Sequence, residues 1–193
     1  MVRRALIVLL LLAGAAGAET GELPALFDVR GVAADDVLNI RAQPRASAEI
    51  LGTLAPEAEG VEVVDAADGW GQVNAGERAG WVAMRFLVRQ TGQEGLPEAL
   101  ACQGTEPFWI LRTGAAPAFV TPEREIAVDA PEILRSRNRT DRYGVLAETA
   151  AGPLRAIVAR ETCGDGMSDR AFGFGIDMIF GGKVYSGCCS IGD

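Results

Sequence analysis

The sequence contains no histidine and only one lysine, Lys183, and each scarcity excludes a class of function. Without histidine there is no imidazole base to activate a nucleophile and no imidazole ligand for zinc. Nucleic-acid binding draws much of its affinity from clustered lysine and arginine, whereas this chain has a net charge of −8. We therefore expect no nucleic-acid partner, no metal and no cofactor.

Long apolar runs are also missing, except for a short one at the amino terminus. Arg3 and Arg4 precede an apolar run over residues 5–13, which is too short to cross a bilayer comfortably. Ala16-Gly17-Ala18 then places small residues at the two positions that a signal peptidase inspects. These features predict a signal peptide over residues 1–18 and a periplasmic or secreted product without a stable membrane anchor. An uncleaved anchor is the alternative.

The cysteines all lie in the second half of the chain, at Cys102, Cys163, Cys188 and Cys189. An even number of cysteines in an exported protein predicts structural bridges, here two. None of them has Cys-x-x-Cys spacing, which argues against a zinc site and against redox exchange.

A polar, glycine- and proline-containing segment, residues 91–97, has no apolar period and is typical of a short linker. We therefore expect a first domain over residues 23–90, a linker over 91–99 and a second domain over 100–193.

Short apolar stretches about ten residues apart run through the first domain, which indicates a small β-barrel. Three of them carry motifs that resemble those of bacterial SH3 domains. The motifs are Leu38-Asn39-Ile40-Arg41-Ala42-Gln43-Pro44, Asp68-Gly69-Trp70-Gly71-Gln72-Val73, and Gly80-Trp81-Val82 with Phe86-Leu87. The resemblance implies an SH3-like barrel. Similar modules are associated with cell-wall peptides in some proteins and serve as docking or spacer units in others.

Arg41, Trp70 and Trp81 are the candidate binding residues of this domain. A tryptophan beside glycine at a strand edge can line a groove or close a barrel, and Arg41 can bind a carboxylate or cover the core edge.

The clearest local structure of the second domain is a hairpin near the end of the chain. Residues 172–180 alternate apolar and small or polar side chains, Gly181-Gly182 can form a two-residue turn, and residues 183–189 return antiparallel. This register places Phe174 opposite Cys189, and places Cys188 and Cys189 on opposite faces of the sheet.

A bond between the adjacent cysteines would be strained, so each should pair with a distant partner. We expect Cys163 to pair with Cys188 and Cys102 with Cys189. The remaining short stretches favour β-structure and none has a helical period. The predicted class is all-β, an SH3-like barrel followed by a disulfide-stabilised antiparallel barrel or sandwich.

Two motifs of this domain resemble an uncharacterised bacterial envelope domain found in periplasmic proteins and lipoproteins. They are Cys102-Gln103-Gly104-Thr105-Glu106-Pro107-Phe108-Trp109 and Cys163-Gly164-Asp165-Gly166-Met167-Ser168-Asp169-Arg170. The resemblance implies an envelope location and no particular activity. Glu106 and Trp109 are the candidate binding residues here.

These features favour an envelope binding or adaptor protein, not an enzyme, whose partner is peptidoglycan or an envelope protein. The alternative is a hydrolase acting on the cell wall, with Glu106 or Asp169 transferring the proton.

Overall fold

The computed structural model describes residues 22–192 and confirms the all-β class. The helical structure in this range is one 3-10 turn, η1 (Met84–Phe86). No helix of the described part is long and apolar enough to cross a membrane. The predicted signal peptide, residues 1–18, lies outside the described residues.

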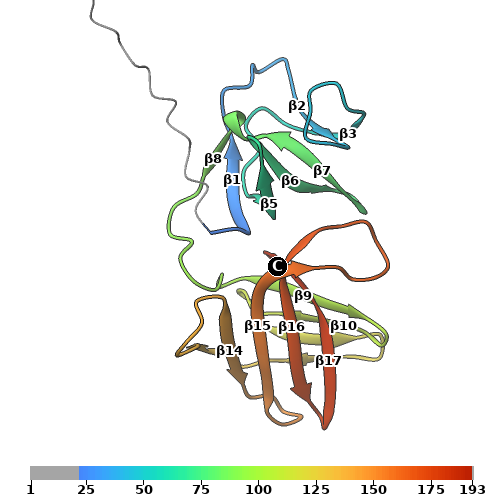
Figure 1. The fold of residues 1–193 in the computed structure, drawn as a ribbon. Helices are drawn as coiled ribbons and strands as arrows, with labels where there is room; N and C mark the ends of the chain where they lie inside the picture. The colour runs from blue at the N-terminus through green and yellow to red at the C-terminus, as the bar shows by residue number, and fades with distance from the viewer. Residues whose placement is uncertain (1–21, 193) are drawn as a thin grey trace, which may run out of the picture.

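The first domain is a small barrel of two antiparallel sheets (Figure 1). One sheet has the order β4-β1-β8 and the other β3-β2-β7-β6-β5. The strands are β1 (Ala25–Val29), β2 (Leu38–Arg41), β3 (Ile50–Leu54), β4 (Val61–Val63), β5 (Asp65–Ala67), β6 (Trp70–Ala75), β7 (Arg78–Ala83) and β8 (Leu87–Arg89). Alternate side chains of β1, β2 and β7 point inward and form the core, as the period of two in a strand requires.

The second domain is one curled antiparallel sheet with the order β12-β11-β10-β9-β17-β16-β15-β14-β13. Its strands are β9 (Leu100–Thr105), β10 (Phe108–Arg112), β11 (Ala118–Thr121), β12 (Arg124–Ala127), β13 (Glu132–Arg135), β14 (Arg142–Ala147), β15 (Leu154–Cys163), β16 (Phe172–Phe180) and β17 (Lys183–Ile191). The curl closes the inner face around a core rich in aromatic side chains, with Phe119 packed edge-on against both Phe180 and Tyr185.

The predicted hairpin is present in the predicted register. Phe174 faces Cys189, Gly175 faces Cys188 and Phe180 faces Lys183. Gly181 and Gly182 have φ values of 57° and 72°, which only glycine adopts readily at both positions of such a turn.

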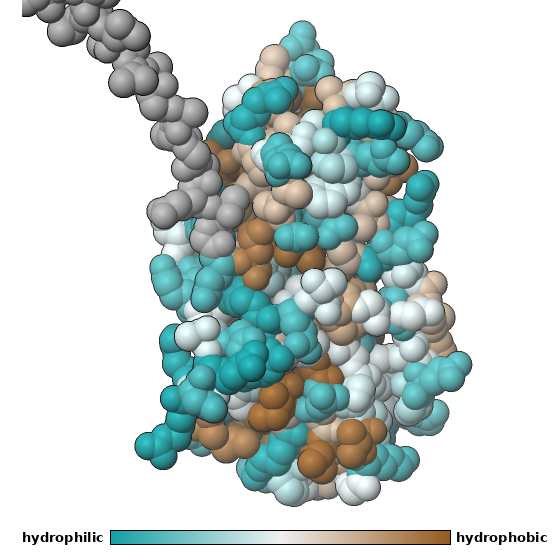
Figure 2. Space-filling model, in the orientation of Figure 1, coloured by the Kyte–Doolittle hydropathy of each residue, from teal (hydrophilic) through white to brown (hydrophobic). Residues whose placement is uncertain are grey.

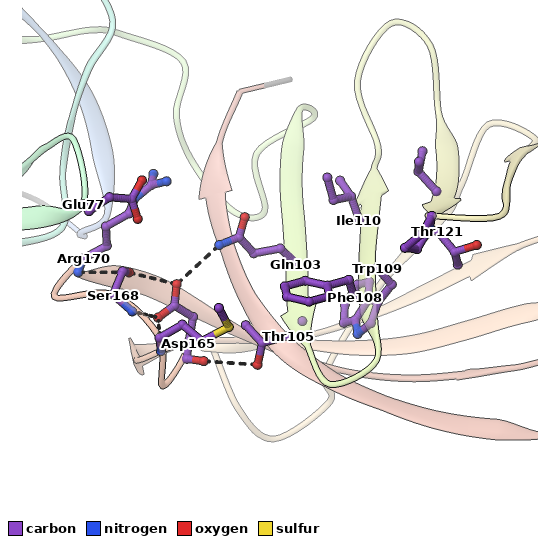
Figure 3. Close-up of a pocket in the computed structure, with 14 residues that line it drawn as sticks. Glu77, Gln103, Thr105, Phe108, Trp109, Ile110, Thr121, Asp165, Ser168 and Arg170 are labelled. Atoms are coloured by element: carbon purple, nitrogen blue, oxygen red, sulfur yellow. Dashed lines mark hydrogen bonds between the residues drawn. The ribbon is translucent and has the colours of Figure 1, made fainter.

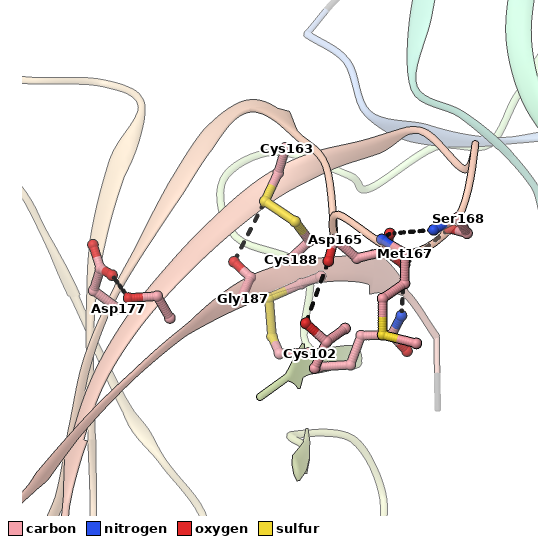
Figure 4. The surroundings of a disulfide bond; sticks show 12 residues. Cys102, Cys163, Asp165, Met167, Ser168, Asp177, Gly187 and Cys188 are labelled. Atoms are coloured by element: carbon pink, nitrogen blue, oxygen red, sulfur yellow. Dashed lines mark hydrogen bonds between the residues drawn. A yellow bond between two sulfur atoms is a disulfide. The ribbon is translucent and has the colours of Figure 1, made fainter. Parts of the chain in front are cut away.

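The cysteines form the two predicted bridges (Figure 4). Cys102–Cys189 joins the neighbouring strands β9 and β17 inside the core, whereas Cys163–Cys188 lies on the outer face, where β15 leaves the regular ladder. The alternation of side chains along β17 explains why adjacent cysteines serve two separate bridges.

The linker is fixed to the first domain by Gln93. Its side chain accepts a hydrogen bond from the Leu26 N–H (2.6 Å) and donates to the carbonyl groups of Leu26 (2.9 Å) and Gln90 (2.7 Å). The guanidinium of Arg160 in β15 then donates to the carbonyls of Pro24 (3.0 Å) and Gly95 (2.6 Å). The linker therefore holds the domains in contact.

Direct contacts complete the interface. The Asn74 side chain donates to the Ala171 carbonyl (2.9 Å) and accepts from the Ala171 N–H (2.9 Å). Gly173 lies so close to Pro24 that an added Cβ would be 2.5 Å from the proline ring. The loop that leads into β16 is thus built against the first domain (Figure 1).

The outer face of β15–β17 carries exposed aliphatic side chains, seen as brown atoms on the lower half of the molecule in Figure 2. Ile179 and Val184 face each other across the hairpin, and Ile157 lies on the next strand.

Candidate functional site

The first candidate site is a groove of about 440 Å³ on the SH3-like domain, which we call the SH3 groove. It brings together two of the predicted binding residues, Arg41 at the end of β2 and Trp70 at the start of β6. It is lined by Gly31, Val32, Ala33, Asp36, Val37, Leu38, Asn39, Arg41, Ala46, Trp70, Ala83, Arg85 and Phe86. The third residue, Trp81 of β7, pairs with Arg41 of the neighbouring strand β2 but does not line the groove.

The polar groups of the SH3 groove are partly held in place. Arg41 Nη1 donates to the Ala48 carbonyl (2.8 Å), which orients a guanidinium that has further N–H groups to offer. Arg85 is exposed and stacks 4.6 Å over the Phe86 ring. Two arginines and one aspartate, Asp36, line this groove, so it is locally positive in an acidic protein.

The second candidate site is a groove of about 520 Å³ between the domains, which we call the interdomain groove (Figure 3). It is formed by the outer face of β9–β11, the loop between β15 and β16, and the β6–β7 turn. The lining residues are Glu77, Gln103, Gly104, Thr105, Phe108, Trp109, Ile110, Val120, Thr121, Pro122, Asp165, Met167, Ser168 and Arg170.

Trp109 takes a different position from the neighbouring apolar residues of β10. Its indole is buried (3% exposed), because β10 turns it into the core, where it lies against Gly104 and Gly187. Phe108 and Ile110, on the opposite face of the strand, are exposed and line the groove. Trp109 therefore lies beneath the surface of the groove and offers a ligand little exposed area.

Asp165 fixes the loop that forms one wall of the interdomain groove. Its carboxylate accepts hydrogen bonds from the N–H groups of Met167 (3.0 Å) and Ser168 (2.9 Å) and from the Ser168 hydroxyl (2.9 Å). Desolvation raises the pKa of Asp165, but these hydrogen bonds outweigh it and hold the pKa below its usual value. The carboxylate stays charged and shapes a turn.

Glu106 and Asp169, the two acids considered for a hydrolase, lie in different parts of the structure. Glu106 is exposed in the turn between β9 and β10 and does not line either groove. Asp169 is exposed, and its main chain pairs with the first domain: its N–H donates to the Glu77 carbonyl (3.0 Å) and its carbonyl accepts from the Ala79 N–H (2.7 Å).

Glu62 of β4 lies between the domains, where its carboxylate accepts a hydrogen bond from the Ile191 N–H (3.1 Å). Desolvation raises the pKa of Glu62 to about 7, against the lowering effects of that hydrogen bond, the Arg170 charge and the Ser190 hydroxyl. Folding and the contact between the domains therefore favour the protonated form of the Glu62 carboxyl group.

Sequence reasoning missed most of the interdomain groove. A signal was present: Phe108-Trp109-Ile110-Leu111 is apolar on both faces of a strand, which indicates that both faces are covered or that one is an interaction surface. Glu77 lies in the other domain, and no sequence pattern places it in the same groove as Met167.

Comparisons with known proteins identify one part of the chain. Residues 36–88 match the family model of the bacterial SH3 domain, which supports the resemblance seen in the motifs of the first domain. No curated protein and no solved structure matches the chain. The segment similar to a bacterial SH3 domain thus lies within the first domain, and β1, which precedes the matched residues, also belongs to the barrel.

Proposed function

We propose that this chain is an exported envelope protein that binds and does not catalyse, and that its SH3 groove contacts peptidoglycan peptides or an envelope protein. The observation that carries the proposal is the meeting of Arg41 and Trp70 in one groove of a bacterial SH3 domain. The local excess of arginine suits a carboxylate on the ligand, and the indole supplies an apolar surface beside it. The two disulfides suit an extracellular or periplasmic protein.

The test is retention of the chain, without residues 1–18 and with its disulfides formed, on insoluble peptidoglycan across a salt series. We expect retention at moderate salt, and loss of most of it in Trp70→Ala and Arg41→Gln. The matched control is Trp81→Phe, which alters a tryptophan outside the groove. Equal retention of all variants would contradict a role for the groove, and no retention would shift the proposal to a protein partner.

The absence of catalysis is tested on the same material. Prolonged incubation with purified peptidoglycan should release no soluble fragments. Release by the unmodified chain that is lost in Glu106→Gln or Asp169→Asn would establish the hydrolase instead.

A further inference from the structure

Three large apolar side chains are exposed around the interdomain groove. Phe108 is 57% exposed, Ile110 40% and Met167 65%, and all three line the same groove. Soluble proteins leave grouped apolar surface of this kind mainly where they bind something, and the groove volume is in the range of known ligand sites. We propose that the interdomain groove binds an extended peptide segment in which a large apolar side chain neighbours a basic one.

The apolar part of the ligand has a defined place. Phe108 and Ile110 project from the same face of β10, two residues apart, and Val120 lies opposite Ile110 on β11. Met167, on the loop between β15 and β16, lines the same groove. Methionine has an unbranched, polarisable side chain that adapts to varied apolar partners, which suits it to cover an inserted side chain.

The wall that carries Met167 is held in position before any ligand arrives. Asp165 closes the turn around Met167 and Ser168, and Gln103 of β9 donates to its carboxylate at 3.5 Å. The main-chain pairing of Asp169 with the first domain fixes the far end of the loop. A groove with fixed walls loses less entropy on binding than a mobile one.

The charges around the groove favour a basic group on the ligand. Glu77 is exposed at the rim, and within residues 22–192 no hydrogen bond or ion pair to its carboxylate is present. Arg170, the arginine among the lining residues, stacks over Phe172 at 5.1 Å and is close enough to Glu62 and Asp165 to lower the pKa of both. Among the lining residues the charge of Arg170 is therefore offset by that of Asp165, and Glu77 remains to pair with a cation.

The composition of the groove favours a peptide over a glycan. Its apolar lining consists mainly of aliphatic and thioether side chains, and Phe108 is the one exposed aromatic ring among the lining residues. A saccharide presents hydroxyl groups that need several polar partners, whereas the Asp165 carboxylate is already occupied by the turn.

The test is a titration of the ¹⁵N-labelled chain, followed by amide chemical shifts. The probe is a blocked heptapeptide with leucine and phenylalanine next to a central arginine; one matched peptide carries glutamate in place of arginine, and a second carries serines in place of the apolar residues. We expect saturable shifts at residues 103–110 and 165–170 with the first peptide, at a Kd of about 1 mM or below. Both matched peptides should bind more weakly.

The variants separate this site from the SH3 groove. Phe108→Ser and Met167→Ser should each weaken binding about tenfold, because both remove exposed anchors without touching the core. Glu77→Gln should weaken it about threefold and reduce its salt dependence. Val184→Ser, at an apolar position of β17 that is even more exposed (72%), and Trp70→Ala in the SH3 groove should leave it unchanged.

The proposal is overturned if no peptide shifts these amides. It is also overturned if Trp70→Ala rather than Phe108→Ser removes binding, since the peptide then occupies the SH3 groove. Larger amide shifts at these residues with the trisaccharide of N-acetylglucosamine than with the first peptide would also overturn it, because the ligand would then be a glycan. None of these outcomes depends on whether the chain is retained on peptidoglycan through its SH3 groove, so the two proposals can fail separately.

Discussion

The first domain forms its core from nine buried apolar side chains, mostly small and aliphatic, and contains no disulfide. The second domain buries sixteen in its core, among them Trp109, Phe119 and Phe174, and adds two disulfides. A barrel of about 65 residues, Ala25 to Arg89, buries a smaller share of its surface than a larger domain does, so it has less stability of its own. We therefore expect the interface with the second domain to stabilise the first domain.

Removing the core disulfide tests how much the bridges stabilise the second domain, and it has the largest expected effect on the free energy of unfolding. The Cys102–Cys189 bridge spans 87 residues, so replacing both cysteines by alanine should lower the free energy of unfolding by about 4.5 kcal/mol. The same change at Cys163–Cys188, which spans 25 residues, should lower it by about 3.5 kcal/mol. Urea unfolding of the three proteins measures both. A larger loss for the shorter loop would contradict the loop-entropy account.

The pH dependence of stability tests the contact between the domains. The pKa of Glu62 is higher in the folded state than in the unfolded chain, so the folded state binds the extra proton. This contribution is complete below about pH 4.5 and is lost as pH rises through about 7. We expect the free energy of unfolding to fall by at most about 3 kcal/mol between pH 5 and pH 8.

The control for this prediction is Glu62→Gln, which keeps an acceptor for the Ile191 N–H and has no charge to bury. It should remove most of the slope and be more stable than the unmodified chain at pH 8. The chain has no histidine to titrate in this window, so a slope that persists in Glu62→Gln would assign the effect elsewhere.

The smallest expected effect comes from one side chain at the interface. Asn74→Asp keeps the acceptor for the Ala171 N–H but replaces the donor with an oxygen that faces the Ala171 carbonyl, which should cost about 2 kcal/mol. In thermal unfolding of this variant, we expect the first domain to unfold in a separate transition at a lower temperature than the second domain. Asn138→Asp makes the same charge change at an exposed position and should leave a single transition. A single, unshifted transition in Asn74→Asp would show that the interface does not support the first domain.

Local sequence patterns determined much of what the structure contains. The alternation in residues 172–180 and the Gly181-Gly182 turn are short-range features, so they specify the hairpin register and with it the opposite faces of Cys188 and Cys189. The motifs around Arg41 and Trp70 predicted the SH3-like barrel, because its turns and strands are close in sequence. The prediction of Trp109 as a binding residue remains a prediction, although the structure places its indole in the core.

Only the tertiary structure decided the sites between the domains. Asn74 and Ala171 are 97 residues apart, and Glu62 and Ile191 are 129 apart, so no local period can relate them. Glu77 reaches the interdomain groove because Asp169 pairs with the β6–β7 turn, and the raised pKa of Glu62 exists because the docked second domain removes water from its carboxylate. Strand alternation and turn formation depend on residues close together in the sequence, so the sequence alone predicts them. Docking of the two domains depends on the complementarity of their folded surfaces, which only the tertiary structure shows.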